Sequence, residues 1–111
     1  MKQLTEEDFS HEIKNGLTLV DFYADWCGPC RMLAPILARL ALKLEGRVSF
    51  AKLNIDHHPA IAEKYEATAF PTIILFKEGK EMGRMVGLRD EDAIMEFINT
   101  ASSKYSTDLV W

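Results

Sequence analysis

Cys27 and Cys30 are the two cysteines of the chain, and they lie where an apolar run gives way to a helical pattern. A disulfide across so short a loop would stabilise the fold by only about 2 kcal/mol, less than a long loop would. Cysteines at positions i and i+3 of a helix lie on one face, close enough to form or break a disulfide with little backbone movement. We therefore interpret the pair as a site that cycles between dithiol and disulfide.

The elements on either side position this pair. Residues 17–24 form a short run of β-branched, aliphatic and aromatic side chains that is typical of a buried strand. After the cysteines, apolar side chains recur at helical spacing up to Gly46, which predicts a helix over about residues 29–44. At the start of this helix, free backbone N–H groups and the helix dipole favour a thiolate, so Cys27 is the predicted nucleophile.

The rest of the chain alternates between the two periodicities. It predicts helices that start near Thr5, Pro59 and Asp90, and strands over residues 48–55, 72–77 and 81–86. Strands that alternate with helices pair in parallel, whereas the short link before residue 81 predicts a hairpin. We therefore expect an α/β fold with a mixed sheet.

Composition limits the class of protein. A chain of 111 residues with 48% hydrophobic and 27% charged residues predicts a single globular domain. The net charge of -4 argues against nucleic-acid binding by a broad basic surface. The N-terminal residues lack the apolar core of a secretory signal, and no apolar run has the length to span a bilayer, so we expect a cytoplasmic protein without a membrane segment.

Residues 20–31, with the sequence VDFYADWCGPCR, closely resemble the active-site signature of the thioredoxin family. Further matches follow in the family's order: AKLNID at 51–56, FPT at 70–72, FKEG at 76–79 and VG at 86–87. Ordered matches over about residues 4–101 are far more specific than a lone C-x-x-C, which also occurs in zinc and haem sites. The resemblance implies the thioredoxin fold, a central mixed β-sheet flanked by helices on both faces. We expect a thioredoxin domain over residues 1–103 and a C-terminal extension over residues 104–111.

The resemblance also implies an activity, that of a general protein-disulfide reductant without a cofactor. In the family, such an oxidoreductase carries electrons from NADPH-dependent thioredoxin reductase to disulfide-containing targets such as ribonucleotide reductase, peroxiredoxin and methionine sulfoxide reductase. We expect this chain to be a monomer. The pair Gly28 and Pro29 goes with reductants in the family. Two alternatives use the same fold, a disulfide isomerase or oxidase, and a non-redox binding subunit or chaperone.

Three residues complete the predicted chemistry at the cysteines. Pro29 has a helical φ and no N–H group, so it fixes the geometry of the first helical turn. Cys30 is the expected resolving thiol, which attacks the mixed disulfide between Cys27 and a target. Asp21 is a carboxylic acid within an apolar run, and burial should raise its pKa toward neutrality. The resemblance makes Asp21 the acid that helps to deprotonate Cys30. A salt bridge with Lys52 is the structural alternative, and both can hold.

The last group of predicted residues would contact the target. About 5–6% of X-Pro bonds in folded proteins are cis, but the resemblance implies a cis Pro71 that faces the cysteines. It also implies that the backbone of Phe70 pairs with an extended target segment. Trp26 is expected to form a wall of the site, unless it is a core tryptophan. The accompanying apolar patch comprises Gly28, Ala69, Phe70, Val86 and Gly87. His57 and His58 invite a metal-site hypothesis, which we reject because adjacent histidines after a strand are usually exposed.

Overall fold

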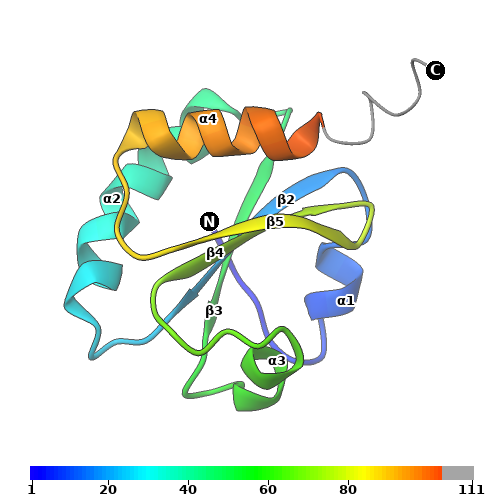
Figure 1. The fold of residues 1–111 in the computed structure, drawn as a ribbon. Coiled ribbons are helices and arrows are strands. Elements are labelled where there is room, and N and C mark those ends of the chain that lie inside the picture. Colours follow the sequence, from blue (N-terminus) through cyan, green and yellow to red (C-terminus); the bar gives the residue numbers. More distant parts are fainter. Residues whose placement is uncertain (104–111) are drawn as a thin grey trace.

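A computed structural model describes residues 1–103, so the prediction of an extension over residues 104–111 lies outside the described residues. Five strands form one sheet in the order β1-β3-β2-β4-β5 (Figure 1). They are β1 (Lys2–Gln3), β2 (Leu17–Tyr23), β3 (Ser49–Asn54), β4 (Thr72–Lys77) and β5 (Lys80–Val86). Strand β2 pairs in parallel with β3 and antiparallel with β4, and β4 pairs antiparallel with β5. The predicted mixed sheet and hairpin are confirmed.

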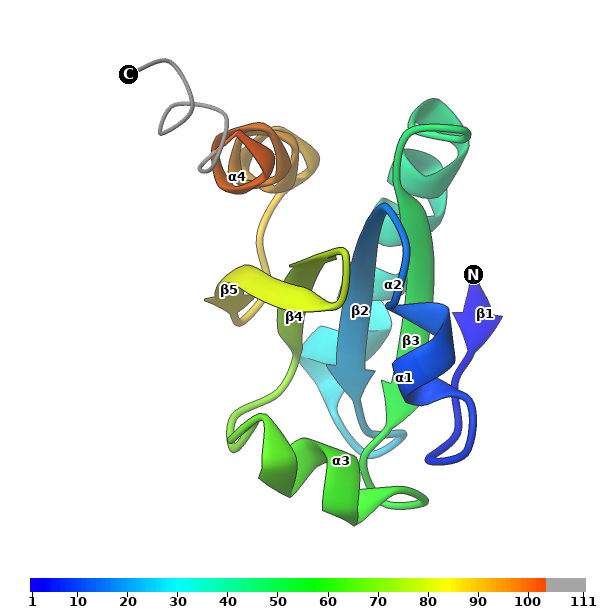
Figure 2. The ribbon, with the colours of Figure 1, turned by 90° about the vertical axis from the view of Figure 1, so that its right-hand side faces the viewer.

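Helices cover both faces of the sheet, with α2 and α4 on one side and α1 and α3 on the other (Figure 2). Their bounds are α1 (Phe9–Glu12), α2 (Gly28–Lys43), α3 (Pro59–Lys64) and α4 (Glu91–Ser102). The predicted start of the first helix at Thr5 is a turn that precedes α1. In this turn the Thr5 N–H donates to Asp8 Oδ1 and the Asp8 N–H donates to Thr5 Oγ1, the reciprocal bonds of a capping box.

The sheet separates two hydrophobic cores because successive strand residues point to opposite faces. Leu19 of β2 packs with the leucines of α2 and the isoleucines of α4. Its neighbour Val20 packs on the other face, with Phe9 of α1 and Ala62 of α3. Asp21 is two residues after Leu19, so its side chain points to the same face of the sheet. The residue paired with Asp21 on β3 is Lys52. The pattern of β2 therefore places a carboxyl group on the face that α2 covers.

Thr18 on β2 carries a buried hydroxyl group. It is 2% exposed, and its Oγ1 has no hydrogen-bond partner within residues 1–103. Replacing an unsatisfied hydroxyl with a methyl group of similar size removes a desolvation cost. We expect Thr18→Val to raise the free energy of unfolding by about 1 kcal/mol, measured by urea denaturation.

Thr72 on β4 provides the matched control, because it is equally buried but its hydroxyl donates to the Ala69 carbonyl. Thr72→Val should lower the free energy of unfolding, since it removes a bond and leaves that carbonyl without its donor. If both valine variants shifted stability in the same direction, hydrogen bonding would not explain the effect at Thr18.

Candidate functional site

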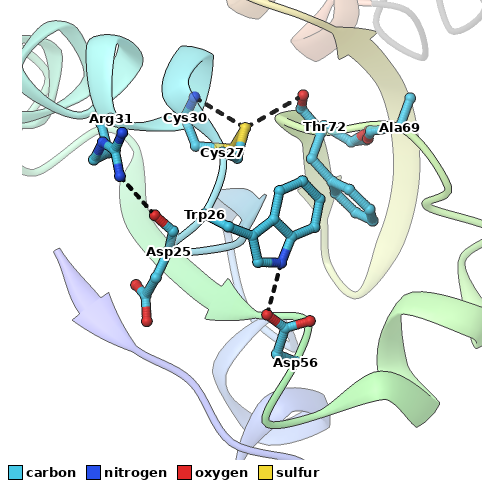
Figure 3. The surroundings of a disulfide bond; sticks show 9 residues. Asp25, Trp26, Cys27, Cys30, Arg31, Asp56, Ala69 and Thr72 are labelled. Carbon is cyan, nitrogen blue, oxygen red and sulfur yellow. Dashed lines mark hydrogen bonds between the residues drawn. A yellow bond between two sulfur atoms is a disulfide. The ribbon is translucent and has the colours of Figure 1, made fainter.

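Cys27 and Cys30 form a disulfide at the N-terminus of α2, with their Cα atoms 5.2 Å apart (Figure 3). Both residues are buried, Cys27 with 4% and Cys30 with 3% of its surface exposed. They pack with Ala24 in a small cluster that the half-buried side chains of Tyr23 and Phe70 cover. Exposure therefore does not separate the two cysteines. Their neighbours do, because Cys27 Sγ lies next to the Phe70 carbonyl whereas Cys30 shares a cavity with Asp21.

The helix begins at the cysteines for a local reason. Cys27 has an extended conformation and is the N-cap residue of α2, and Pro29 lies in the first turn. The Cys27 Sγ atom accepts a hydrogen bond from the Cys30 N–H, with 3.2 Å between nitrogen and sulfur. This N–H and the positive end of the helix dipole would also stabilise negative charge on Sγ after reduction. The local sequence thus gives Cys27 the features of a thiolate nucleophile.

An aromatic wall stands beside the disulfide. The Trp26 side chain is 65% exposed, so the alternative of a core tryptophan is wrong. The Trp26 indole N–H donates to Asp56 Oδ2 over 2.9 Å, as Figure 3 shows. The Phe70 ring packs edge-on against the indole, with ring centroids 6.3 Å apart. Two loops that are distant in the sequence therefore hold this wall in one position.

The loop before β4, which carries Phe70, also approaches Cys27. The Phe70–Pro71 peptide bond is cis, which confirms the expectation from the resemblance. The Phe70 carbonyl oxygen lies 3.5 Å from Cys27 Sγ. The Gly87 N–H donates to the Pro71 carbonyl over 2.8 Å, and Gly87 has a φ of 93°, a conformation that favours glycine. The end of β5 is thereby tied to the loop.

The predicted target-contact residues lie around this loop, with different exposures. Val86 is 43% exposed, and Ala69 is also exposed. Phe70 and Gly28 are half-buried, whereas Pro71 is buried. The structure therefore brings an apolar surface next to Cys27, with Trp26 as its most prominent member.

Asp21 lies behind the cysteines rather than on this surface. It is 4% exposed, and its Oδ1 has no hydrogen-bond partner within residues 1–103. Burial raises the pKa of Asp21 to about 7, and the positive charge of Lys52 offsets part of that rise. The predicted direction of the pKa shift is confirmed. Asp21 and Cys30 line one cavity, so the acid is on the side of the second cysteine.

The alternative of an Asp21–Lys52 salt bridge is wrong in the part of the chain that the structure describes. The two residues are register partners, but no ion pair joins them. The Lys52 ammonium instead lies 5.6 Å from the centroid of the Tyr23 ring. Side chains on adjacent parallel strands share a face without necessarily touching, and here Lys52 acts on Asp21 through its charge alone.

Sequence reasoning missed Asp56, which holds the Trp26 indole, and Asn54, which organises the loop after β3. Asn54 is buried, its Oδ1 accepts from the Asp56 N–H, and its amide donates to Asp25. Both residues lie within the AKLNID match, at the end of the strand next to the cysteine loop. This position could have identified them as site residues from the sequence.

Two negative expectations concern metals and membranes. Within residues 1–103, no group of three or more histidine, cysteine, aspartate or glutamate residues could hold a metal ion. The His58 imidazole lies 3.9 Å from Glu6, a single carboxylate. No helix in the same part of the chain combines the length and the apolar character needed to cross a bilayer.

Comparisons with known proteins agree with this geometry. The family model described as Thioredoxin matches residues 1–100. A thioredoxin of Chlamydia caviae is 48% identical over 102 residues, which cover 92% of this chain and 99% of that protein. A thioredoxin of Chlamydia pneumoniae is 50% identical over 99 residues, with 89% and 96% covered. One from Staphylococcus aureus is 40% identical over 97 residues, with 87% and 93% covered.

Proposed function

Because the chain belongs to the thioredoxin family and is a thioredoxin-type disulfide reductant, we propose that Cys27 attacks target disulfides and that Cys30 resolves the product. The observation that carries this assignment is the position of Cys27 as the N-cap of α2, with the Cys30 N–H bonded to its sulfur. That N–H and the helix dipole stabilise a thiolate at Cys27 in particular.

The reaction transfers two electrons in two exchanges. The Cys27 thiolate attacks one sulfur of the target disulfide, forms a mixed disulfide and releases the other target sulfur as a thiolate. The Cys30 thiolate then attacks Cys27 Sγ, which closes the Cys27–Cys30 disulfide and releases the second target thiolate. The target is reduced to a dithiol, and the reductant is oxidised to the disulfide that the structure contains.

Asp21 is the proposed proton acceptor for Cys30. A group with a pKa near 7 exchanges protons readily at neutral pH, and Asp21 reaches that value through burial. The cavity that Asp21 and Cys30 share allows a proton to move between them through water. Lys52 lowers the pKa of Asp21 through its charge, so its proposed role is to tune the acid.

The apolar surface around Cys27 is the proposed docking site for the target. An extended target segment would pair with the backbone of Phe70, whose carbonyl lies next to Cys27 Sγ. Trp26, Ala69, Val86 and Gly87 would contact its side chains through apolar surface. Main-chain pairing gives affinity without strong dependence on the target's sequence, as a general reductant requires.

The partners follow from this role. Thioredoxin reductase, which receives its electrons from NADPH, is the proposed electron donor. The proposed acceptors include ribonucleotide reductase, peroxiredoxin and methionine sulfoxide reductase. We propose a monomer in the cytoplasm, since the cysteines, the acid and the docking surface all come from one chain and a reducing compartment maintains the dithiol.

A trapping experiment tests the order of the two cysteines. Cys30→Ser should accumulate a mixed disulfide between Cys27 and its target, because the resolving thiol is missing. The complex would be seen on a non-reducing gel after incubation with insulin and should disappear on addition of dithiothreitol. The matched variant Cys27→Ser should give no complex. Accumulation with Cys27→Ser instead would reverse the roles.

A further inference from the structure

A cavity of about 370 Å³ lies behind the cysteine pair, on the face of the sheet that α2 covers. Strands β2 and β3 and helix α2 contribute its lining, and Cys30 reaches it from α2. Pockets that bind small organic ligands typically have volumes of about 300–1,000 Å³. The cavity therefore has room for a molecule with one ring or a short aliphatic chain. It is distinct from the exposed surface around Trp26, where targets dock.

One wall of the cavity is apolar. Ala34 and Ala38 lie one turn apart on α2, so their methyl groups are on the same helix face. The half-buried Tyr23 of β2 also lines the cavity. A short alanine side chain at both helix positions leaves space that a larger residue would fill.

The cavity also has polar lining residues, among them Asp21 and Lys52. Asp21 contributes the buried carboxyl group whose Oδ1 has no hydrogen-bond partner within residues 1–103. Lys52 contributes an ammonium group that forms no ion pair in that same part of the chain. A buried polar atom without a partner is costly, so a ligand that accepts a hydrogen bond from Asp21 and lies near the half-buried Lys52 ammonium would gain binding free energy.

We propose that this cavity binds a small monocarboxylate with an apolar body. The carboxyl group of Asp21 donates a hydrogen bond to the ligand carboxylate, and the Lys52 ammonium compensates its charge. The apolar body packs against Ala34 and Ala38. A protonated carboxyl next to a carboxylate avoids the repulsion between two anions, and the lysine then faces one negative charge rather than two.

Binding of this kind depends on pH, because Asp21 must carry a proton. The other residues with titratable or charged groups that line the cavity are Met1, through its terminal amino group, Tyr23, Asp25, Arg31 and Lys52, whereas Cys30 is held in the disulfide and does not titrate. Of these, Asp25 is the residue that would add negative charge, and it is exposed. With burial raising the pKa of Asp21 to about 7, affinity should be constant below that pH as long as the ligand itself remains ionised. Above it, affinity should fall about tenfold for each pH unit.

A bound carboxylate would also affect turnover, a consequence that rests on the proposed role of Asp21. It would hold the proton of Asp21 and displace water from the space between Asp21 and Cys30. The acid could then no longer accept the proton of Cys30, and release of the reduced target would slow. A small metabolite carrying a carboxylate would act as an inhibitor that does not compete with the target.

A titration of the oxidised protein with benzoate, monitored by the NMR signals of the backbone amides, tests the site directly. At about pH 6, benzoate should shift the resonances of Ala34, Ala38 and Lys52. At about pH 9 the dissociation constant should be about 100-fold larger. Benzamide has the same ring without the charge, and it should bind more weakly than benzoate at about pH 6.

Four variants assign the contributions of single residues. Lys52→Gln should weaken benzoate binding at least about tenfold, and Ala34→Leu should abolish it by filling the cavity. Asp21→Asn should remove the pH dependence, because its amide donates a hydrogen bond at every pH. Lys64→Gln is the matched control. Its ammonium also lies 5.6 Å from a tyrosine ring, but on α3, remote from the cavity. It should bind benzoate like the natural chain.

Two results would overturn the proposal: shifts confined to residues outside the cavity, or equal affinity for benzoate and benzamide. The rate of insulin reduction, measured with and without benzoate at about pH 7, where part of Asp21 is ionised and can accept a proton, separates the two levels of inference. Binding without any change in that rate would leave the site in place and remove Asp21 from the proposed mechanism. Absence of binding would remove the site and leave the mechanism untouched.

Discussion

Cys27→Ser should reduce insulin disulfides no faster than the same assay mixture without the protein. A serine hydroxyl remains protonated at neutral pH and is a poor nucleophile toward sulfur, so the first exchange cannot start. The fold should survive, because the lost disulfide closes a short loop and contributes only about 2 kcal/mol. Turnover would be measured in an assay coupled to NADPH and thioredoxin reductase, with circular dichroism as the check on folding.

The double variant, with serine at both Cys27 and Cys30, separates this function from the non-redox alternative. A binding subunit or chaperone would keep its partner interaction when both cysteines are replaced, whereas a reductant loses every activity. Retention of function by a folded double-serine variant would therefore contradict the mechanism.

Asp21→Asn should increase the free energy of unfolding by about 4 kcal/mol at about pH 8.5. The folded state holds the pKa of Asp21 at about 7, whereas the usual value is 3.8. Between these values the folded protein keeps the proton and the unfolded chain has lost it. The stability of the natural chain therefore falls as the pH rises through this window and levels off above 7. An asparagine cannot ionise, so the variant lacks this loss.

Urea denaturation at several pH values between about 4 and 9 measures this effect. The difference between the variant and the natural chain should be small at the acidic end and largest above pH 7. The same variant should slow insulin reduction at least about tenfold at neutral pH, because Cys30 loses its proton acceptor. Asp25→Asn removes an exposed carboxylate nearby and should change neither property. Parallel stability curves for Asp21→Asn and the natural chain would show that Asp21 is not the source of the pH dependence.

The sheet and its helices were predictable because local patterns determine them. Residues 73–76 are continuously apolar within the strand predicted over residues 72–77, and the structure has β4 at those bounds. The helix after the cysteines begins at Gly28, close to the predicted start at about residue 29. Its start and length are determined within one element, by Pro29 and by the apolar periodicity. The first helix was less predictable. Its capping bonds at Thr5 and Asp8 are local, but the four-residue α1 depends on how Phe9 packs in the core.

The parts of the site that could not be predicted depend on contacts between distant segments. The exposure of Trp26 follows from its bond to Asp56, thirty residues later in the chain. The separation of Asp21 and Lys52 follows from side-chain conformations, although their register was predictable from the strands. The cavity behind Cys30 requires the small side chains of α2 to face β2 and β3, which no single segment specifies.

The division of the interior by the sheet lets the two halves of the molecule diverge at different rates. The aromatic cluster of Phe9, Phe22, Tyr65 and Phe76 fills the half beneath α1 and α3, away from Asp21 and its cavity. Substitutions in the core beneath α1 and α3 would alter folding stability without changing thiol–disulfide exchange at Cys27 and Cys30. Substitutions beneath α2 would alter both together. Substitutions that raise stability without changing the redox potential should therefore be sought in the core beneath α1 and α3. Natural selection acts on the two cores under the same constraint.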